Sequence, residues 1–137
     1  MLIVRPVPDP EKAKKLCDEF DRPYDPDVMT YYAFESEDET GKDAKSLGLC
    51  RLTLKGGRNE IISLDYAKGT KDTEALIITA RAVMNFMYRC EVRTAYLGDG
   101  VPDELSSLLG FERMNGRRAI DLFEFYKSPC RYGEKNG

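Results

Sequence analysis

The sequence contains no histidine among its 137 residues. This absence excludes a Ser-His or Cys-His nucleophile pair, an HExxH zinc motif and an imidazole general base. If the protein is an enzyme, proton transfer must therefore use Glu, Asp, Tyr, Lys, Cys or water.

The sequence also lacks paired cysteines. Its four cysteines, Cys17, Cys50, Cys90 and Cys130, are widely and irregularly spaced, and no two form a C-x-x-C motif. Such spacing predicts neither a disulfide framework nor a zinc site. We expect reduced thiols and no bound metal.

Long apolar runs and clustered charge are missing as well. No run approaches the roughly 20 apolar residues of a membrane span, and Met1–Pro6 is too short for a signal peptide. The net charge is −3, with Lys and Arg spread along the chain, which gives nucleic-acid binding no support. We expect a cytoplasmic protein that binds neither membrane nor nucleic acid, with one domain over residues 1–127 and a flexible tail over 128–137.

The first half of the chain predicts one helix and four strands. Asp9 and Pro10 are a typical N-cap and first helical residue, and the helix they begin extends to about Phe20. One strand, Leu2–Val7, precedes this helix. The other three form an antiparallel meander, with Gly56-Gly57 as its second turn: Met29–Ser36, Ser46–Lys55 and Asn59–Ala67.

The second half begins with a long, heavily buried helix over Thr73–Arg89, identified by apolar residues at helical spacing. A strand over Val92–Leu97 follows, and a strand-helix-strand unit of this length usually makes a right-handed parallel crossover. A short helix then begins near Pro102 and ends at Gly110. The last predicted element is a hairpin of Phe111–Met114 and Ala119–Tyr126 around Asn115-Gly116.

This order of elements resembles that of the GNAT superfamily of N-acetyltransferases, of which the chain looks like a divergent member. The local match is Leu105–Phe111, which reads Leu-Ser-Ser-Leu-Leu-Gly-Phe where the family often carries Leu-Tyr-x-x-Leu-Gly-Phe. The resemblance implies an α/β (α+β) fold, in which a mixed sheet is built from a meander, a β-α-β unit and a C-terminal hairpin.

The resemblance also implies a site for acetyl-CoA. The strand Asn59–Ala67 would separate from the next parallel strand, and pantetheine would lie along it near Leu64 and Tyr66. The pyrophosphate would sit at the N-terminus of the long helix, where free N–H groups and the helix dipole attract anions. The implied contacts in this loop and in the short helix are Lys68, Gly69, Thr70, Lys71, Thr73 and Ser106.

The phosphate loop departs from the family pattern, Gln/Arg-x-x-Gly-x-Gly/Ala-x-x-Leu. When the final Leu is aligned with Leu76, only the basic character of Lys68 is kept. Asp72 and Glu74 serve the helix as its own anionic caps and would repel a pyrophosphate. The loop is therefore either a weakened site for acetyl-CoA or a structural turn.

The catalytic positions depart from the pattern too. The family's frequent general-acid Tyr falls on Ser106, which cannot act as a phenolic acid. Glu60 falls where some members carry a base that acts through water, although an exposed acid after a Gly-Gly turn is the more common explanation. Asp65, Tyr66 and Tyr96 are further candidates.

Three hypotheses remain. The first is an acyl-CoA-dependent N-acyltransferase, in which a small-molecule or peptide amine attacks the thioester directly, without a covalent enzyme intermediate. The second is a catalytically degraded GNAT-like binding or dimerisation module, and a homodimer is left open. The third is an unrelated α/β domain. The acids Asp21, Asp25 and Asp27 could form a lip that suits a cationic amine, or simply a solvated loop.

Overall fold

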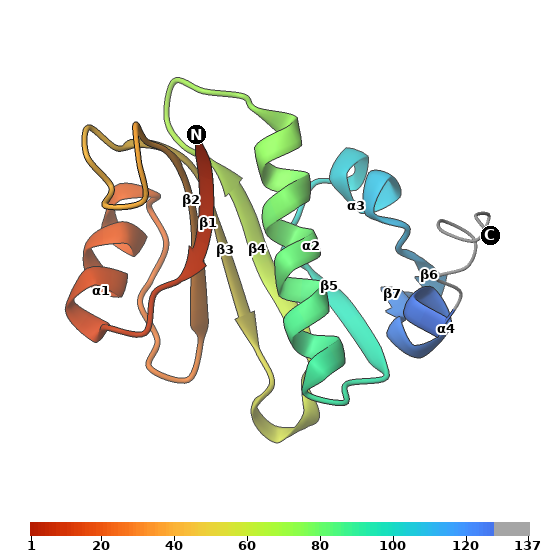
Figure 1. Ribbon diagram of the computed structural model, residues 1–137. Helices are drawn as coiled ribbons and strands as arrows, with labels where there is room; N and C mark the ends of the chain where they lie inside the picture. Colours follow the sequence, from red (N-terminus) through yellow and green to blue (C-terminus); the bar gives the residue numbers. More distant parts are fainter. Residues whose placement is uncertain (128–137) are drawn as a thin grey trace.

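The computed structural model describes residues 1–127, which form one seven-stranded mixed sheet with helices on both faces (Figure 1). The strand order is β1-β2-β3-β4-β5-β7-β6, and only β4 and β5 are parallel. The elements are β1 (Leu2–Pro6), α1 (Pro10–Glu19), β2 (Met29–Glu35), β3 (Lys45–Thr53), β4 (Glu60–Tyr66), α2 (Thr73–Arg89), β5 (Thr94–Gly100), α3 (Asp103–Leu109), β6 (Glu112–Met114), β7 (Arg117–Asp121) and α4 (Leu122–Lys127).

The predicted meander and crossover are confirmed. Strands β1 to β4 pair antiparallel in sequence order, and α2 then connects β4 to its parallel neighbour β5. The predicted start of α1 is also confirmed, because the Asp9 side chain accepts a hydrogen bond from the Glu11 backbone N–H at 3.2 Å.

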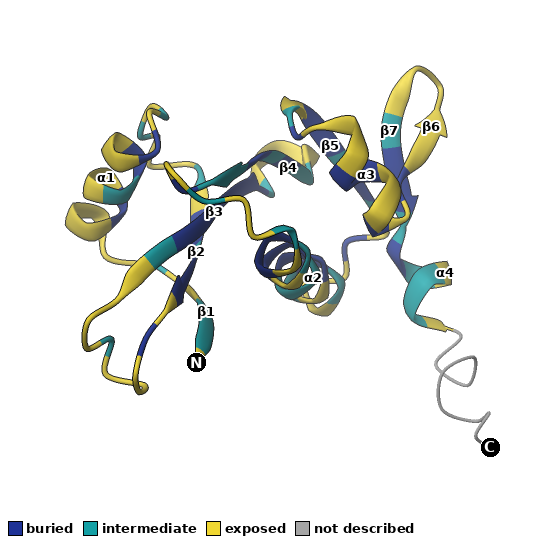
Figure 2. Cartoon of the chain, turned by 90° about the horizontal axis from the view of Figure 1, so that it is seen from above, coloured by how far each residue is buried: buried dark blue, intermediate teal, exposed yellow. Residues whose placement is uncertain are grey.

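The two long helices cover opposite faces of the meander (Figure 2). Tyr32 and Leu49 pack beneath α1, whereas their neighbours Tyr31 and Cys50 belong to the main core beneath α2. This alternation is the period of two that a strand imposes on its side chains. The face of α2 that enters the main core carries Leu76, Ala80, Val83, Met84 and Met87.

The prediction of a strand over Ala119–Tyr126 is wrong in its second half. Strand β7 ends at Asp121, and the chain continues as the helix α4. The Asp121 carboxylate accepts the Glu124 backbone N–H at 3.1 Å, as an N-cap does, and this bond lowers the pKa of Asp121. Leu122 is fully buried, so turning into a helix keeps its side chain in the core.

Strand β5 and the Gly56-Gly57 turn also differ from the predictions. The strand ends at Gly100, three residues beyond the predicted Leu97. Strand β5 begins at Thr94 because the Val92 N–H bonds back to the carbonyl of Met87 at 3.0 Å, which closes the turn after α2. The turn at Gly56-Gly57 is a short 3₁₀ helix rather than a two-residue hairpin. The predicted tail, residues 128–137, lies outside the described residues.

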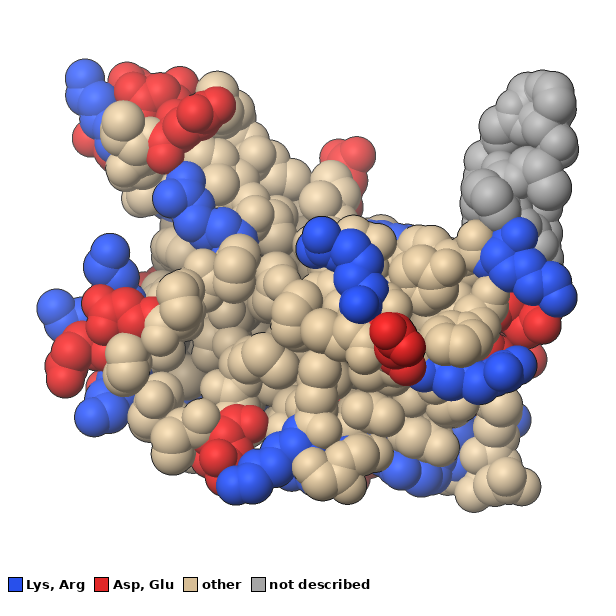
Figure 3. Space-filling model, turned by 60° about the horizontal axis from the view of Figure 1, so that its bottom comes forward, with Lys and Arg blue, Asp and Glu red and all other residues tan. Residues whose placement is uncertain are grey.

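The described residues contain no helix that is both long and apolar enough to cross a membrane. On the face shown in Figure 3, basic and acidic side chains form small separate groups. The charge is therefore as dispersed on this face as it is along the sequence.

The β6–β7 hairpin depends on its turn. Asn115 and Gly116 have φ angles of 56° and 81°, the left-handed values that a type I′ turn requires at both central positions. Gly116→Val should lower the free energy of unfolding by about 1–3 kcal/mol, because a β-branched residue is strained at positive φ.

Urea denaturation of the two proteins measures this effect. Gly116→Asn is the matched control and should lose much less, since Asn tolerates the left-handed region. An unchanged midpoint for the Val variant would contradict the turn assignment.

Candidate functional site

Strands β4 and β5 pair over only part of their length. Their parallel register begins with Glu60 opposite Tyr96 and ends with Ser63 opposite Gly100. Beyond Ser63, residues Leu64–Tyr66 pair with β3 on one side, and no described strand pairs with their other side. The two strands thus open as a V, and its β4 arm offers backbone groups that a ligand lying along the strand can hydrogen-bond.

The V begins at a bulge in β4. Ile61 lies opposite Leu52 and Ser63 lies opposite Arg51, so Ile62 is an extra residue on its strand. A β-bulge bends its strand and increases the local twist. The bulge therefore sits where β4 begins to turn away from β5.

Two glycines of β5 allow the close approach at this bulge. A Cβ atom on Gly100 would lie 2.8 Å from the Ile62 carbonyl oxygen and 2.9 Å from the Ser63 Cβ. A Cβ atom on Gly98 would lie 3.0 Å from the same carbonyl. A side chain at Gly100 would force the backbone of one strand to shift, and a side chain at Gly98 would crowd the same carbonyl.

Glu60 lies at the closed end of the V. Its carboxylate pairs with the Arg58 guanidinium at 2.7 Å, and its side chain is 16% exposed. The carboxylate also lies over the β5 backbone, since a Cβ atom on Gly98 would be 2.5 Å from Glu60 Oε2. A partly exposed carboxylate in this position can accept a proton, either directly or through water.

The loop between β4 and α2 is a closed turn. The Tyr66 and Thr73 hydroxyls lie 2.8 Å apart and join the end of the strand to the start of the helix. The backbone N–H and the hydroxyl of Thr70 both donate to the Ala67 carbonyl, at 3.0 and 2.9 Å. Gly69 has a φ of 78°, which explains why glycine stands there.

The two lysines of this loop are exposed. Lys68 pairs with Asp21 at 3.2 Å, and both side chains are more than two-thirds exposed, so the pair contributes little stability. Lys71 is also exposed. Both lysines can therefore turn toward a ligand at small cost.

The N-terminus of α2 is capped by its own acid. The Asp72 carboxylate accepts the Ala75 N–H at 3.0 Å, and Glu74 adds a second negative charge in the first turn. The N–H groups of Thr73 and Glu74 have no partner within the helix, because the first turn of any helix leaves its donors free. An anion at this end would meet two free donors and two carboxylates.

Leu64 and Ser106 do not offer side chains to a ligand. The Leu64 side chain is 1% exposed and lies in the main core, so only its backbone can serve the site. Ser106 is 4% exposed in α3, and its carbonyl accepts the Phe111 N–H at 3.1 Å. This bond closes the helix beyond Gly110, whose φ of 94° confirms the predicted glycine cap.

The further catalytic candidates have structural partners. Asp65 makes a two-pronged ion pair with Arg22, at 2.9 and 2.8 Å, which also raises the pKa of Arg22. Tyr96 lies beneath the Arg117 guanidinium, 3.9 Å from the ring centre. Asp65 thus ties the segment after α1 to β4.

The acids after α1 do not form a free acidic lip. Asp21 pairs with Lys68, and Asp27 pairs with Lys55 at 2.8 Å. Two of the three acidic side chains are thus at least partly neutralised, which weakens the case for a cationic ligand at this loop.

The buried thiols are chemically inert. Burial raises the pKa of Cys17 and of Cys50, so both stay protonated at neutral pH and are poor nucleophiles. Cys90 is exposed, and all three thiols are free, whereas Cys130 lies outside the described residues. Within residues 1–127, no cluster of three Cys, Asp or Glu side chains could hold a metal ion.

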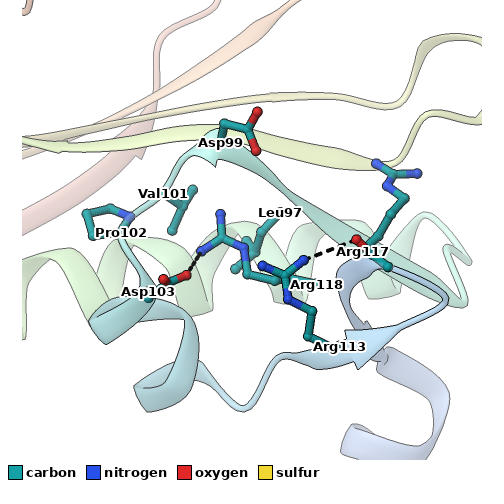
Figure 4. A pocket seen from close by; sticks show the side chains of 9 residues that line it. Leu97, Asp99, Val101, Pro102, Asp103, Arg113, Arg117 and Arg118 are labelled. Atoms are coloured by element: carbon teal, nitrogen blue, oxygen red, sulfur yellow. Dashed lines mark hydrogen bonds and ion pairs between the residues drawn. The ribbon is translucent and has the colours of Figure 1, made fainter.

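A polar pocket of about 420 Å³ opens at the C-terminal end of β5, between α3 and the β6–β7 hairpin (Figure 4). The Arg118 guanidinium spans it, with Nη1 3.0 Å from Asp103 and Nη2 2.6 Å from the Gly98 carbonyl oxygen. Arg113 donates to the Gly116 carbonyl at 3.1 Å. The pocket is lined by Leu97, Asp99, Val101, Pro102, Asp103, Arg113, Gly116, Arg117 and Arg118.

This pocket was not predicted, although the sequence carries signals for it. Gly98 and Gly100 alternate at the end of a strand, which indicates close backbone approach. A two-residue turn at Asn115-Gly116 also places Arg113 opposite Arg118, which is the observed register.

No protein-family model matches the sequence, and no curated protein sequence matches it. Several solved structures share its fold. YhhK from E. coli, determined with coenzyme A bound, has a TM-score of 0.61 and 18% identity over 88% of this chain and 98% of its own. The spermidine/spermine N-acetyltransferase SpeG from Vibrio cholerae has a TM-score of 0.60 and 13% identity over 93% of this chain and 99% of its own.

The IAA acetyltransferase from Bacillus cereus is similar at a TM-score of 0.58 and 12% identity, covering 88% of this chain and 99% of its own. The chain therefore has the GNAT acetyltransferase fold over nearly the full length of these proteins, and the resemblance seen in the sequence is confirmed for the fold. At this level of identity, neither activity nor substrate follows from the fold.

The contact between Gly100 and the bulge can be tested by adding one methyl group. Gly100→Ala places a Cβ against the Ile62 carbonyl and the buried Ser63, so β4 or β5 must shift. We expect a loss of about 1–3 kcal/mol in the free energy of unfolding, as for overpacking in a core.

Asp99→Ala is the control, because Asp99 is the exposed residue between the two glycines and should change stability by less than about 0.5 kcal/mol. Equal denaturation midpoints for Gly100→Ala and Asp99→Ala would show that the close contact is not a constraint.

Proposed function

We propose that the protein is an acyl-CoA-dependent N-acyltransferase that transfers an acetyl group from acetyl-CoA to an amine. The observation that carries the proposal is the V between β4 and β5, with unpaired backbone at Leu64–Tyr66, the α2 N-terminus at one end and Glu60 at the other. Structures of the same fold support it, since two are acetyltransferases and a third holds coenzyme A.

The residues present fit acetyl-CoA in part. The unpaired backbone of Leu64–Tyr66 would bond the amide groups of pantetheine, as a strand bonds an extended peptide. The pyrophosphate would meet the N–H groups of Thr73 and Glu74, with Lys68 and Lys71 near enough in sequence to add positive charge. The bound thioester supplies an acyl group that an amine can attack directly.

Glu60 would act as the base in this reaction. It takes a proton from the ammonium group of the acceptor through water, and the freed nitrogen attacks the thioester carbonyl carbon. The C–N bond forms, the nitrogen loses its second proton to water, the C–S bond breaks, and the electron pair leaves on sulfur. Because Ser106 stands where a phenolic acid would, the departing thiolate takes its proton from solvent.

Acetyl-CoA should bind weakly because of the acids at the α2 N-terminus. At an effective dielectric of about 20, charges about 6 Å apart interact by roughly 3 kcal/mol before screening by salt. Even a third of this value from each of Asp72 and Glu74 weakens binding by about tenfold or more. We expect a Kd in the range of tens of micromolar or poorer, as an order-of-magnitude estimate.

Asp72→Asn with Glu74→Gln should tighten binding of acetyl-CoA by about tenfold, and by more at low salt. The helix is preserved, since Asn caps as well as Asp and Gln favours helix. Isothermal calorimetry at two salt concentrations measures the change.

Helix α1 provides the matched control. It has the same arrangement, an N-cap Asp9 with Glu11 in the first turn, away from the V. Asp9→Asn with Glu11→Gln should leave the affinity for acetyl-CoA unchanged. Submicromolar binding by the wild type would contradict the weakened loop, and no binding by any variant would overturn the acyltransferase.

Glu60→Gln keeps the shape of the side chain and removes its basicity. If Glu60 is the general base, kcat should fall by about 10²-fold or more, with the KM for acetyl-CoA little changed. Steady-state release of coenzyme A across a pH range is the measurement. Matching pH profiles for the two proteins would exclude Glu60 from this role.

A further inference from the structure

Two arginines face each other across the β6–β7 hairpin. Arg113 and Arg118 are register partners, so their Cβ atoms are about 5 Å apart on one side of the hairpin. Like charges directly opposite each other destabilise a strand pair. In the view of Figure 4, both guanidinium groups point into the pocket between the hairpin and α3.

The arginines that line the pocket differ in their partners. Arg118 pairs with Asp103, whose side chain is 90% exposed, while the Arg118 side chain itself is only 10% exposed. Among the described residues, no carboxylate pairs with Arg113 or Arg117. Asp99 is the other acid of the lining, and Arg117 turns its guanidinium away from the pocket onto the Tyr96 ring (Figure 4).

The Arg118 guanidinium is already fixed in position to bind an anion. Its side chain is nine-tenths buried and is held by the Asp103 carboxylate and the Gly98 carbonyl. Arg113 is exposed, and within residues 1–127 its guanidinium is held by one backbone carbonyl at the hairpin turn, so it can move onto a ligand. A fixed guanidinium and a movable one suit bidentate binding of a carboxylate or phosphate.

The pocket also adjoins the candidate catalytic centre. The Gly98 carbonyl accepts from Arg118, and the Glu60 carboxylate lies over the same glycine. Glu60 lies on the Tyr96 face of the sheet and Arg118 on the Leu97 face, so their side chains approach Gly98 from opposite faces of β5. The phosphates of acetyl-CoA would instead lie at the start of α2, a different element from those that line the pocket.

We infer that Arg113 and Arg118 bind the carboxylate or phosphate group of the amine that is acylated. The acceptor is then a small amine that carries its own negative charge, such as an amino acid or an amino phosphate. Polyamines are disfavoured, because their positive charges would meet the arginines. The inference rests on the proposed acyl transfer for the identity of the ligand, but not for the presence of the anion site.

Anion binding can be measured without turnover. The ¹⁵N-labelled chain is titrated with inorganic phosphate and with glutamate, and the backbone signals of residues 113–118 are followed by NMR. Arg113→Gln should weaken binding about tenfold, as expected for one lost charge-assisted contact, and Arg113→Lys should retain much of the affinity. Arg93→Gln, at the exposed ion pair with Asp121, is the matched control and should change nothing.

Acetylation assays show whether the bound anion belongs to the acceptor amine or to the coenzyme. With acetyl-CoA, glutamate and phosphoethanolamine should be acetylated in preference to spermidine. Arg113→Gln should raise the KM for the anionic amine about tenfold and leave the KM for acetyl-CoA unchanged. A raised KM for acetyl-CoA alone would instead place a coenzyme phosphate in the pocket and overturn the inference.

The remaining outcomes separate this inference from the acyltransferase itself. If phosphate and glutamate shift none of the signals of residues 113–118, or if Arg113→Gln binds them as well as the wild type, there is no anion site. If spermidine is the better acceptor, the acceptor assignment is wrong while acyl transfer stands. If anions bind through Arg113 but no amine is acetylated, the proposed function fails and the anion site remains.

Discussion

The contact between the Ile62 bulge and the glycines of β5 is the constraint on which the candidate site depends. One extra residue in β4 turns this strand away from its neighbour, and glycines at 98 and 100 let the two backbones touch before they part. The backbone beyond Ser63 is unpaired because the two strands separate at this contact, which we call the junction. Glu60 lies just before the junction and the α2 loop just after it, so one local irregularity sets the relative position of both.

Negative and positive charge are distributed differently at the two arms of the V. On the β4 side, α2 supplies its own N-cap through Asp72, so its dipole is already partly satisfied. On the β5 side, the hairpin brings Arg113 and Arg118 together, and of the two only Arg118 pairs with a carboxylate among the described residues. The arm at which we propose that the pyrophosphate binds is thus the less receptive to anions, and the other arm is the more receptive.

The sequence was sufficient for most of the fold because its signals are local. Helical spacing marked α2, glycine and Asn-Gly pairs marked the turns, and the order of elements then allowed few topologies. The failure at α4 is instructive, since Ile120, Leu122 and Phe123 are compatible with a strand, whereas the Asp121 carboxylate caps a helix that begins at Leu122. Contacts between residues distant in sequence, such as the pair of Arg22 and Asp65, leave no local signal at all.

The sequence predicted the features of the candidate site that depend on strand order and helix capping. It did not predict the pocket, which depends on which side chains strand pairing brings together. The parallel neighbours β4 and β5 were expected, and so was the capping role of Asp72. The pocket depended on a register that only the turn at Asn115-Gly116 defines. Its arginines were read as scattered charge, because strand pairing, rather than clustering in the sequence, brings them together.

The length of the turn in the β6–β7 hairpin determines more than the stability of the hairpin. Side chains alternate between the faces of a strand, so inserting or deleting one residue in the turn would exchange Arg118 for one of its neighbours opposite Arg113. The net charge of the chain would be almost unaltered, and the pairing of β7 with β5 would keep Arg118 at the Gly98 carbonyl, yet Arg113 would no longer lie opposite it. Among homologous sequences, the number of residues between these two arginines should therefore vary less than the identity of the residues themselves.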